Sequence, residues 1–334
     1  MFNIDEIVFY RENHYLQYPK ILQIEITNVC PLNCPQCYKE TKANHISFNV
    51  FCDTLRKAND MGVKAIMLNG GEPFCHPHIV DMLLELKKYN FYAATFSSGV
   101  GITQAIAKKI KNVNFDLLLS LNGSTYETNQ KSRDGFYHTL SAAAILKSEE
   151  MDFGINWVAR KDNTYDFENM LILMDNIGAS YINVVCNKLN GDGEIDSKIS
   201  IEEYIYLRDI IKKNSDKNIQ IQNCYNTLRI FCGYDKNIKF AGCSAGISLC
   251  NVTASGNFMP CTHFYHEESY TSLYDYWHNS DFLKKLRLIR NEKCDFDCEY
   301  KKECFPCYAM NKEYYESFDI KNFQCPIMPN MEVM

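Results

Sequence analysis

The sequence predicts an α/β fold in which parallel strands alternate with crossover helices, followed by a cysteine-rich module. From Ile21 to Ser215, short β-rich apolar runs alternate with stretches of helical period, the pattern of strands joined by crossover helices. Beyond Gly242 the chain becomes irregular, rich in turns and dense in cysteine. The first region holds six strand–helix pairs, fewer than the eight of a full barrel. Periodicity therefore leaves two architectures open, a doubly wound sheet and a partial barrel.

The expected elements can be placed along the chain. We expect strands at residues 21–27, 64–69, 91–97, 115–121, 154–158 and 181–185. We expect helices at residues 50–61, 77–88, 102–111, 136–147, 165–177 and 201–214. The chain thus divides into an N-terminal extension at 1–20, the strand–helix region at 21–215, a bridging segment at 216–240 and the cysteine-rich module at 241–334. The module has few long apolar runs, so we expect it to fold around metal.

Composition and charge exclude several classes of protein. The 334 residues are 46% hydrophobic, 13% aromatic and 23% charged, which excludes a disordered or collagen-like chain. The net charge of −6 includes no basic stripe that could neutralise a phosphate backbone, so we expect no nucleic acid partner. The sequence contains no run of about 18 apolar residues and no signal core, so we expect a cytoplasmic protein that neither crosses a membrane nor is exported.

The sixteen cysteines are the unusual feature of the composition. Disulfides are rare in the reducing cytoplasm, where cysteines more often bind metal or react. One group consists of Cys30, Cys34 and Cys37. Eight more crowd the last quarter of the chain: Cys243, Cys250, Cys261, Cys294, Cys298, Cys304, Cys307 and Cys325. Their number and grouping indicate metal sites.

The first group directly follows the first expected strand. It therefore lies at the carboxyl end of the sheet, where such folds have their active sites. Thiolates suit iron–sulfur clusters, and three ligands instead of four leave one iron open to bind another molecule. The alternatives are a zinc site completed by a distant residue and three unconnected buried cysteines. Structural zinc usually binds two pairs of closely spaced cysteines, which this loop does not provide.

In spacing and position, this loop resembles the C-x3-C-x2-C signature of the radical S-adenosylmethionine (SAM) superfamily. The resemblance implies a partial (β/α)6 TIM-like barrel, a 4Fe–4S cluster on Cys30, Cys34 and Cys37, and SAM chelating the open iron. The family usually has an aromatic residue just before the third cysteine, to contact adenine. Here Gln36 occupies that position and Tyr38 follows the cysteine, so Tyr38 is the candidate for adenine contact.

Polar residues at later strand ends extend the resemblance. The turn Gly70-Gly71-Glu72 closes the second expected strand, and the family uses such a turn to receive the methionine end of SAM. Glycines let the backbone approach closely, and a carboxylate can bind an ammonium group. The family binds the ribose and the SAM carboxylate at the next strand ends, where this chain has Ser97, Ser98, Ser120, Asn122 and Arg133. Each of these residues alone is also a common turn former or surface charge.

The tail cysteines provide eight thiolates, enough for two four-cysteine sites; two structural zinc ions are the alternative. Their order resembles the SPASM extension of radical SAM enzymes: a cysteine, Gly256, a second cysteine, a tight group of four and a single cysteine. The tight group has its outer spacings exchanged relative to the usual order. The resemblance implies two auxiliary 4Fe–4S clusters, hence three clusters in all. One would take Cys243, Cys250, Cys261 and Cys307, and the other Cys294, Cys298, Cys304 and Cys325.

The resemblance further implies an oxidoreductase that cleaves SAM reductively to methionine and a 5′-deoxyadenosyl radical, which takes hydrogen from an unactivated carbon. SPASM enzymes commonly crosslink ribosomally made peptides, so a peptide maturase is the leading hypothesis. Its partners would be a precursor peptide and a flavodoxin or ferredoxin reductant. Residues 1–20 are too few for a fused leader-binding domain, so leader recognition would rest on a separate protein or on the enzyme surface.

Other functions stay open. A sulfatase-maturase-like enzyme or a small-alcohol dehydrogenase would oxidise a side chain or sugar and would need a carboxylate base. A peptide epimerase would need a thiol that returns a hydrogen atom, and Cys224 and Cys232 are the candidates, unless they are buried small hydrophobes. Outside enzymes, the alternative is an electron-transfer iron–sulfur protein, against which the three-cysteine loop and the glycine-rich turn argue.

Overall fold

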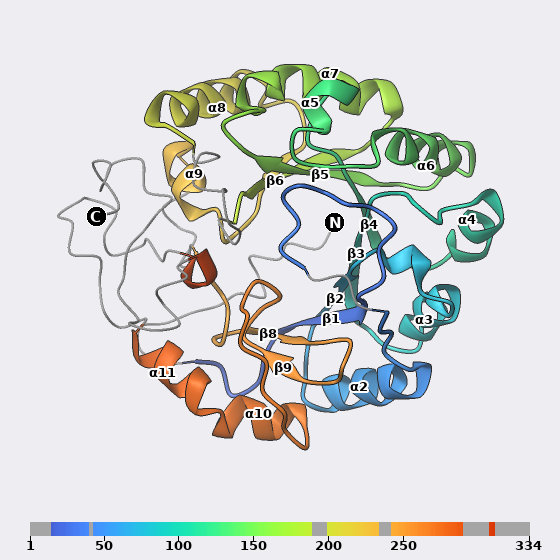
Figure 1. Ribbon diagram of the computed structural model, residues 1–334, viewed down its shortest axis with the longest axis vertical. Coiled ribbons are helices and arrows are strands. Elements are labelled where there is room, and N and C mark those ends of the chain that lie inside the picture. Colours follow the sequence, from blue (N-terminus) through green and yellow to red (C-terminus); the bar gives the residue numbers. More distant parts are fainter. Residues whose placement is uncertain (1–14, 40–42, 189–198, 234–241, 290–306, 311–334) are drawn as a thin grey trace.

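A curved, mostly parallel sheet forms the centre of the protein (Figure 1). The structure, a computed structural model, describes residues 15–39, 43–188, 199–233, 242–289 and 307–310. Within these ranges nine strands form one sheet in the order β7-β6-β5-β4-β3-β2-β1-β8-β9. The strands are β1 (Ile21–Thr27), β2 (Ala65–Gly70), β3 (Tyr92–Ser97), β4 (Asp116–Ser120), β5 (Gly154–Ala159), β6 (Tyr181–Cys186), β7 (Ile219–Ile221), β8 (Leu249–Val252) and β9 (Phe258–Met259).

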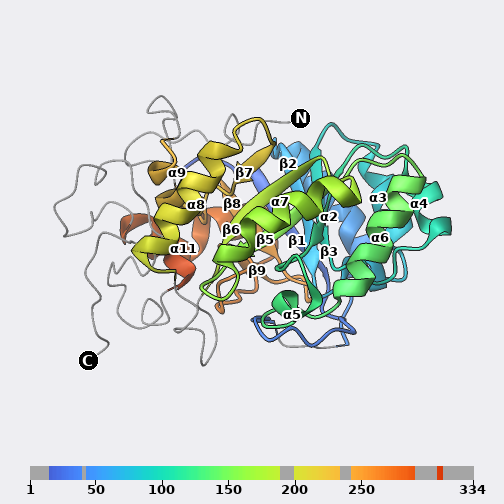
Figure 2. The same ribbon diagram turned by 90° about the horizontal axis from the view of Figure 1, so that it is seen from above.

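The strand order decides between the two architectures that periodicity leaves open. Strands β1 to β7 follow one another in consecutive order and every neighbouring pair is parallel. A doubly wound sheet would instead reverse its order beside the first strand. The helices lie around the outside of the curved sheet, as Figures 1 and 2 show. The fold is therefore the partial barrel, and the six expected strands end within one residue of their predicted positions.

The six expected helices are present, with ends within two residues of their predicted positions, and further helices occur beside them. The helices are α2 (Phe48–Asp60), α3 (Ile79–Leu86), α4 (Gln104–Ile110), α5 (Tyr126–Asn129), α6 (Phe136–Ser148), α7 (Phe167–Ile177), α8 (Ile201–Lys213), α9 (Asn226–Phe231), α10 (Leu273–Asn279) and α11 (Asp281–Ile289), with short 3₁₀ turns η1 (Pro73–Cys75), η2 (Thr164–Asp166) and η4 (Tyr308–Met310). Ser200 and Glu203 form a capping box at the start of α8, which satisfies two backbone N–H groups that have no partner within the helix. Gly178 ends α7 with a φ of 82°, a conformation that glycine adopts without strain.

None of the described helices combines the length and hydrophobicity needed to cross a bilayer.

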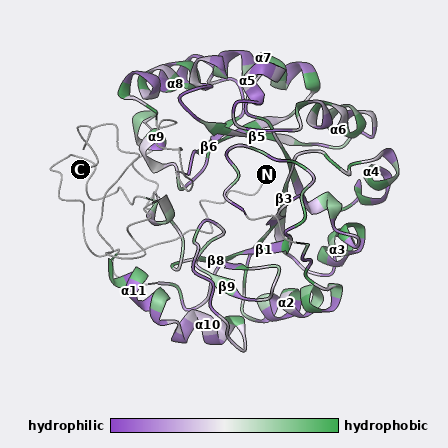
Figure 3. Cartoon of the chain, viewed as in Figure 1, coloured by the Kyte–Doolittle hydropathy of each residue, from purple (hydrophilic) through white to green (hydrophobic). Residues whose placement is uncertain are grey.

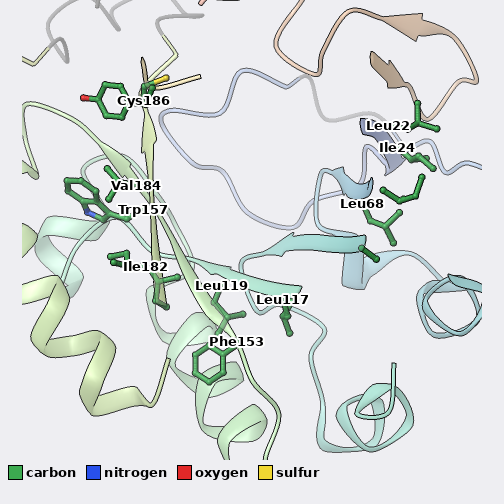
Figure 4. Packing of buried hydrophobic residues seen from close by; sticks show 14 of the residues in the cluster. Leu22, Ile24, Leu68, Leu117, Leu119, Phe153, Trp157, Ile182, Val184 and Cys186 are labelled. Atoms are coloured by element: carbon green, nitrogen blue, oxygen red, sulfur yellow. The ribbon is translucent and has the colours of Figure 1, made fainter. Parts of the chain in front are cut away.

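The main hydrophobic core lies between the outer face of the sheet and the helices. Side chains that alternate along each strand point to this face, among them Leu117 and Leu119 of β4 and Ile182 and Val184 of β6 (Figure 4). The helices carry both hydrophobic and hydrophilic segments (Figure 3), as expected when one helix face is buried. This layer fixes the barrel wall and leaves the strand ends free to carry polar residues.

The segment after residue 241 is built into the same sheet. β8 pairs with β1 in parallel, and β9 pairs antiparallel to β8. Trp277 of α10 and Leu283 of α11 belong to the main core. Residues 242–289 therefore contribute to the core of the barrel, although the module has few long apolar runs. β7, in the expected bridging segment, likewise extends the sheet beside β6.

Candidate active site

The three-cysteine loop leaves the carboxyl end of β1. The backbone N–H of Cys37 donates to the carbonyl oxygen of Cys34 at 3.0 Å. Burial raises the pKa of Cys30 to about 11. A backbone hydrogen bond from Leu32 opposes this rise, and the neighbouring Glu72, Cys34 and Cys37 add to it. The three thiols are thus close enough to influence one another. A cation bound beside Cys30 would lower its pKa and favour the thiolate form that iron requires.

Hydrogen bonds anchor this loop to the segment that follows β4. The backbone N–H of Gln36 donates to the carbonyl oxygen of Ser132 at 3.1 Å, and the Asn122 side chain donates to Oε1 of Gln36 at 2.9 Å. The N–H of Asp134 lies 3.4 Å from the sulfur of Cys34. Gln36, which stands where the family usually has an aromatic residue, therefore braces the loop against Asn122.

The glycine turn is packed directly against the start of the cysteine loop. The N–H of Gly71 donates to the carbonyl of Thr27 at 2.7 Å, and the N–H of Glu72 donates to the carbonyl of Val29 at 2.8 Å. A Cβ atom at Gly70 would lie 2.0 Å from the Thr27 oxygen, and one at Gly71 would lie 2.3 Å from the Val29 oxygen. Both positions therefore need glycine, because the backbones of β1 and β2 meet here at close range.

The carboxylate of Glu72 joins this turn to the end of β3. Its Oε1 accepts from the N–H of Phe74 at 3.1 Å and the hydroxyl of Ser97 at 2.8 Å. Its Oε2 accepts from the N–H and the hydroxyl of Ser98 at 2.7 and 2.5 Å. Burial raises the pKa of Glu72, while these hydrogen bonds act in the opposite direction. With both oxygens accepting two bonds each, Glu72 holds Ser97 and Ser98 in place.

The remaining expected SAM contacts lie at the end of β4 and beyond it. Ser120 and Asn122 are buried, and Asn122 also donates to the hydroxyl of Ser132 at 2.9 Å. Within the described part of the chain, Nε of Arg133 and Oδ1 of Asn69 are buried without a hydrogen-bond partner. Buried polar atoms without partners are rare in proteins. An open donor and an open acceptor beside the cysteine loop fit a polar ligand such as SAM.

Tyr38 turns toward the other side of β1. Its hydroxyl lies 3.2 Å from Oγ1 of Thr262, and its ring contacts that of His263 with centroids 4.4 Å apart. Thr262 follows β9, whereas Ser98 and Asn122 lie at strand ends on the opposite side of β1 in the sheet order. The structure thus places Tyr38 against the tail segment rather than beside the other expected SAM contacts.

Sequence reasoning missed a buried polar cluster around Glu25. Oε1 of Glu25 accepts from Oγ1 of Thr262 at 2.8 Å and from Nδ2 of Asn251 at 3.2 Å, and it forms an ion pair with Lys39. Glu25 is 3% exposed. The cluster links the cysteine loop, through Lys39, to the residues after β8 and β9. The signal was present in the sequence, since Glu25 is a charged residue within the strand β1.

Four of the eight tail cysteines fall within the described residues. Burial, and then the neighbouring Cys243 and Cys307, raise the pKa of Cys261. Burial also raises the pKa of Cys250, and the nearby Arg287 acts in the opposite direction. In the part of the chain that the structure describes, no group of three or more His, Cys, Asp or Glu side chains has closed to metal-binding geometry. The other expected ligands, Cys294, Cys298, Cys304 and Cys325, lie outside the described residues.

The two candidate hydrogen-donor thiols have different surroundings. Cys224 lies 3.2 Å from the ammonium of Lys188. Cys232 follows α9, and burial raises its pKa to about 12. The nearby Lys212 and Arg208 of α8 act in the opposite direction. Lys212 belongs to the outer ring of helices, so Cys232 lies outside the barrel wall.

Comparisons with known proteins agree with this geometry. Residues 24–174 match the Radical SAM superfamily. A PqqA peptide cyclase of Ruegeria pomeroyi is 28% identical over 181 residues, which is 52% of this chain and 48% of that protein. An AdoMet-dependent heme synthase of Methanosarcina barkeri is 23% identical over 336 residues, covering 89% of this chain and 95% of that protein. The match thus spans about half the length of the peptide cyclase but nearly all of the heme synthase.

Among solved structures, Streptococcus suis SuiB bound to S-adenosylmethionine shares the fold, with a TM-score of 0.73 at 19% identity over 88% of this chain and 74% of SuiB. The matched superfamily region contains the cysteine loop, the glycine turn and the polar ends of β3 and β4. Over residues 24–174, the resemblance to the radical SAM superfamily is therefore confirmed.

Proposed function

We propose that this protein is a radical SAM enzyme whose first 4Fe–4S cluster is held by Cys30, Cys34 and Cys37. The observation that carries this is the contact between the cysteine loop and the glycine turn, where no side chain fits between Gly71 and the carbonyl of Val29. Bound there, the cluster and SAM would supply the 5′-deoxyadenosyl radical that takes a hydrogen atom from the substrate.

The chain's own residues would bind and orient SAM. Glu72 holds Ser97 and Ser98 at the end of β3 with four accepted hydrogen bonds. Ser120 and Asn122 extend the polar edge at β4, and Nε of Arg133 offers a buried donor that no described residue uses. Because these groups are buried, water is kept from the strand ends, as a reactive radical requires.

The tail would hold two auxiliary 4Fe–4S clusters on its eight cysteines, within a SPASM module at residues 241–334. Eight thiolates leave no open iron when each cluster has four ligands. This favours a role in electron transfer over direct coordination of the substrate. The barrel would occupy residues 21–215, with 216–240 as the bridge between the two.

The proposed substrate is a ribosomally made peptide, which the enzyme crosslinks. The names of the peptide cyclase and of SuiB, also solved with its precursor peptide SuiA, support a peptide. One hydrogen atom of the peptide would pass to the 5′-deoxyadenosyl radical and give 5′-deoxyadenosine, and one proton and one electron would leave the peptide radical as the new bond forms. The electron would go to an auxiliary cluster, so the product is two hydrogens lighter than the peptide.

A tetrapyrrole is the second candidate substrate. The observation that favours it is the relative named a heme synthase, which this chain matches over 95% of its length. A tetrapyrrole product would be recognised by its visible absorption.

The test begins with anaerobic reconstitution and SAM cleavage under dithionite. The wild-type protein should release 5′-deoxyadenosine, and the variant with Cys30, Cys34 and Cys37 all changed to Ala should not, with a loss of about four irons. Cys52→Ala, which changes a half-buried cysteine on α2, is the matched control and should keep both properties. A wild-type protein that holds the clusters but releases no 5′-deoxyadenosine would show that it is an electron-transfer protein.

The substrate is tested with peptides encoded beside this gene. Mass spectrometry in deuterated water should show a product two hydrogens lighter. A product of unchanged mass apart from one deuterium would instead indicate epimerisation.

A further inference from the structure

The inner face of the barrel sheet is accessible to a ligand. The helices cover the outside of the sheet (Figure 1), where alternate strand residues such as Ile24 and Leu68 are buried in the main core. Successive residues of a strand point to opposite faces, so the residues between them point into the barrel. Several of these inner residues are only half-buried, although their strands have neighbours on both sides: Gln23, Met67, Asn69, Asn156, Val158 and Asn183. An interior packed with side chains would bury them.

Carboxamide side chains recur on this inner face. Nδ2 of Asn183 on β6 donates to Oδ1 of Asn156 on β5 at 2.9 Å. On β1, Oε1 of Gln23 accepts from the N–H of Thr262 at 3.0 Å. A carboxamide offers one hydrogen-bond acceptor and one donor group. An inner face lined with such groups suits a ligand that itself consists of amides, as the main chain of a peptide does.

Glu25 places a carboxylate with one open oxygen on the same face. Its Oε1 accepts from Thr262 and Asn251 and pairs with Lys39. Its Oε2 accepts no hydrogen bond from any residue that the structure describes. Glu72, by contrast, uses both of its carboxylate oxygens. Glu25 is 3% exposed, so its free oxygen needs a donor from elsewhere.

Asn251 provides a second open acceptor beside it. Asn251 of β8 pairs in register with Gln23 of β1, and its Nδ2 donates to Oε1 of Glu25 at 3.2 Å. Because a carboxylate only accepts, the amide must turn Nδ2 toward Glu25, which leaves Oδ1 directed elsewhere. Asn251 is 0% exposed, and its Oδ1 is buried without a partner in the described part of the chain. Two neighbouring strands thus each present a buried acceptor that lacks a donor.

The charges around these acceptors favour a neutral donor over a cation. The ammonium of Lys39 already forms an ion pair with Glu25, so a second buried cation would leave an uncompensated charge. An amide N–H donates a hydrogen bond without adding charge. A peptide main chain repeats this donor at every residue except proline, which matches two acceptors on adjacent strands.

We propose that Oε2 of Glu25 and Oδ1 of Asn251 accept hydrogen bonds from main-chain N–H groups of the peptide substrate and thereby set its position inside the barrel. The inference rests on the proposed function, which supplies the peptide. The contact would hold the peptide between the cysteine loop, which reaches Glu25 through Lys39, and the segment after β9, which reaches it through Thr262.

The test uses the peptides encoded beside this gene and analogues in which one N–H at a time is replaced by an ester oxygen. Binding to the full chain, reconstituted without oxygen and loaded with SAM, is measured by isothermal titration. In the wild type, at least one ester should weaken binding about tenfold, as expected for the loss of a hydrogen bond to a charged acceptor.

Glu25→Gln should weaken binding of the unmodified peptide by a similar factor. Lys39, Thr262 and Asn251 would hold the oxygen of the new amide and leave its NH2 group facing the peptide N–H. The ester that weakens binding to the wild type should therefore bind Glu25→Gln at least as well as the unmodified peptide does. An ester also weakens the neighbouring carbonyl as an acceptor, so the difference between the two proteins is the decisive quantity.

Glu203→Gln is the matched control, because Glu203 is a buried carboxylate in the capping box of α8. It should keep the wild-type response to every ester. Equal effects of every ester on Glu25→Gln and on the wild type would overturn the proposal. If Glu25→Gln does not fold, Asn251→Ala takes its place and should cancel the effect of one ester, and equal effects would again overturn the proposal. A wild type that binds none of the peptides would instead contradict the proposed function itself.

Discussion

The hydroxyl of Thr262 donates a hydrogen bond of 2.8 Å to the carboxylate of Glu25 across 237 positions of the chain. Glu25 lies on β1, two residues before the strand ends, and Thr262 directly follows a tail cysteine. Lys39, two residues beyond Cys37, pairs with the same carboxylate oxygen. The segments that carry the first cysteine group and the tail cysteines are therefore joined through one buried carboxylate.

We expect Glu25→Gln to destabilise the protein by about 1–3 kcal/mol, because it removes the charge partner of Lys39 and replaces an acceptor with an amide. Asp53→Asn on α2 is the control, since Asp53 pairs with Arg56 and Lys57 at an exposed site, where ion pairs contribute about 0–1 kcal/mol. Urea unfolding measures both variants. Equal losses would show that the buried cluster has no special role in stability.

Glu72→Gln should weaken SAM binding about tenfold or more without loss of iron. The substitution weakens the hydrogen bonds by which the carboxylate holds Ser97 and Ser98, and a hydrogen bond to a charged group contributes about 1.5–3 kcal/mol. The amide would also turn an N–H donor toward the N–H of Ser98, which now donates to Oε2. Isothermal titration with SAM measures the affinity. Ser98→Ala should produce a smaller loss, and unchanged affinity in Glu72→Gln would exclude a role of this carboxylate in the SAM site.

Gly71→Ala should reduce iron binding at the first cluster. The new Cβ would lie 2.3 Å from the backbone oxygen of Val29, so the cysteine loop must shift, at a cost of about 1–3 kcal/mol. Gly62→Ala is the control: its φ of 78° strains the backbone, as that of Gly71 does not, but a Cβ atom there has no neighbour within 4 Å. Iron analysis and EPR of the first cluster should separate the two variants, and normal iron retention in Gly71→Ala would show that the close contact is dispensable.

His76 should make the fold sensitive to mild acid. Burial lowers the pKa of His76 below its usual value of 6.5. A hydrogen bond to the backbone of Ile46 opposes this shift, and the charges of His45 and His78 add to it. Below about pH 6.5, the imidazole of His76 binds a proton more readily in the unfolded chain than in the folded chain. The free energy of unfolding therefore decreases as the pH falls.

Replacement of this histidine should reduce the acid sensitivity. His76→Gln should lose less stability than the wild type between about pH 7 and pH 5.5, by the linkage of protonation to folding. His78→Gln, at an exposed neighbouring side chain, should keep the wild-type dependence. Unfolding by urea at several pH values measures this, and parallel curves for wild type and His76→Gln would refute the assignment.

Cys261→Ala should separate SAM cleavage from product formation. The first cluster keeps its three ligands, so 5′-deoxyadenosine should still appear. The peptide radical loses its electron acceptor, so the rate of formation of the product two hydrogens lighter should fall at least about tenfold, which is about 1.4 kcal/mol in activation free energy. Liquid chromatography and mass spectrometry follow both products in one reaction. Normal product yield would remove the auxiliary clusters from the electron path.

The sequence by itself determined the features that depend on nearby residues. Alternating apolar runs predicted six strands to within one residue, because side-chain periodicity is a local property of the chain. The spacing of Cys30, Cys34 and Cys37 after β1 and the glycine turn after β2 predicted the cofactor site for the same reason.

The tertiary structure decided the features that depend on strand order and register. Only the pairing of β8 with β1 shows that Cys250 lies beside Leu22 in the main core. Only the tertiary structure brings Cys224, before α9, and Cys307, before η4, to the same ammonium group of Lys188. Spacing along the chain lists possible ligands, but the face to which each side chain points is fixed by which strands pair and in what register.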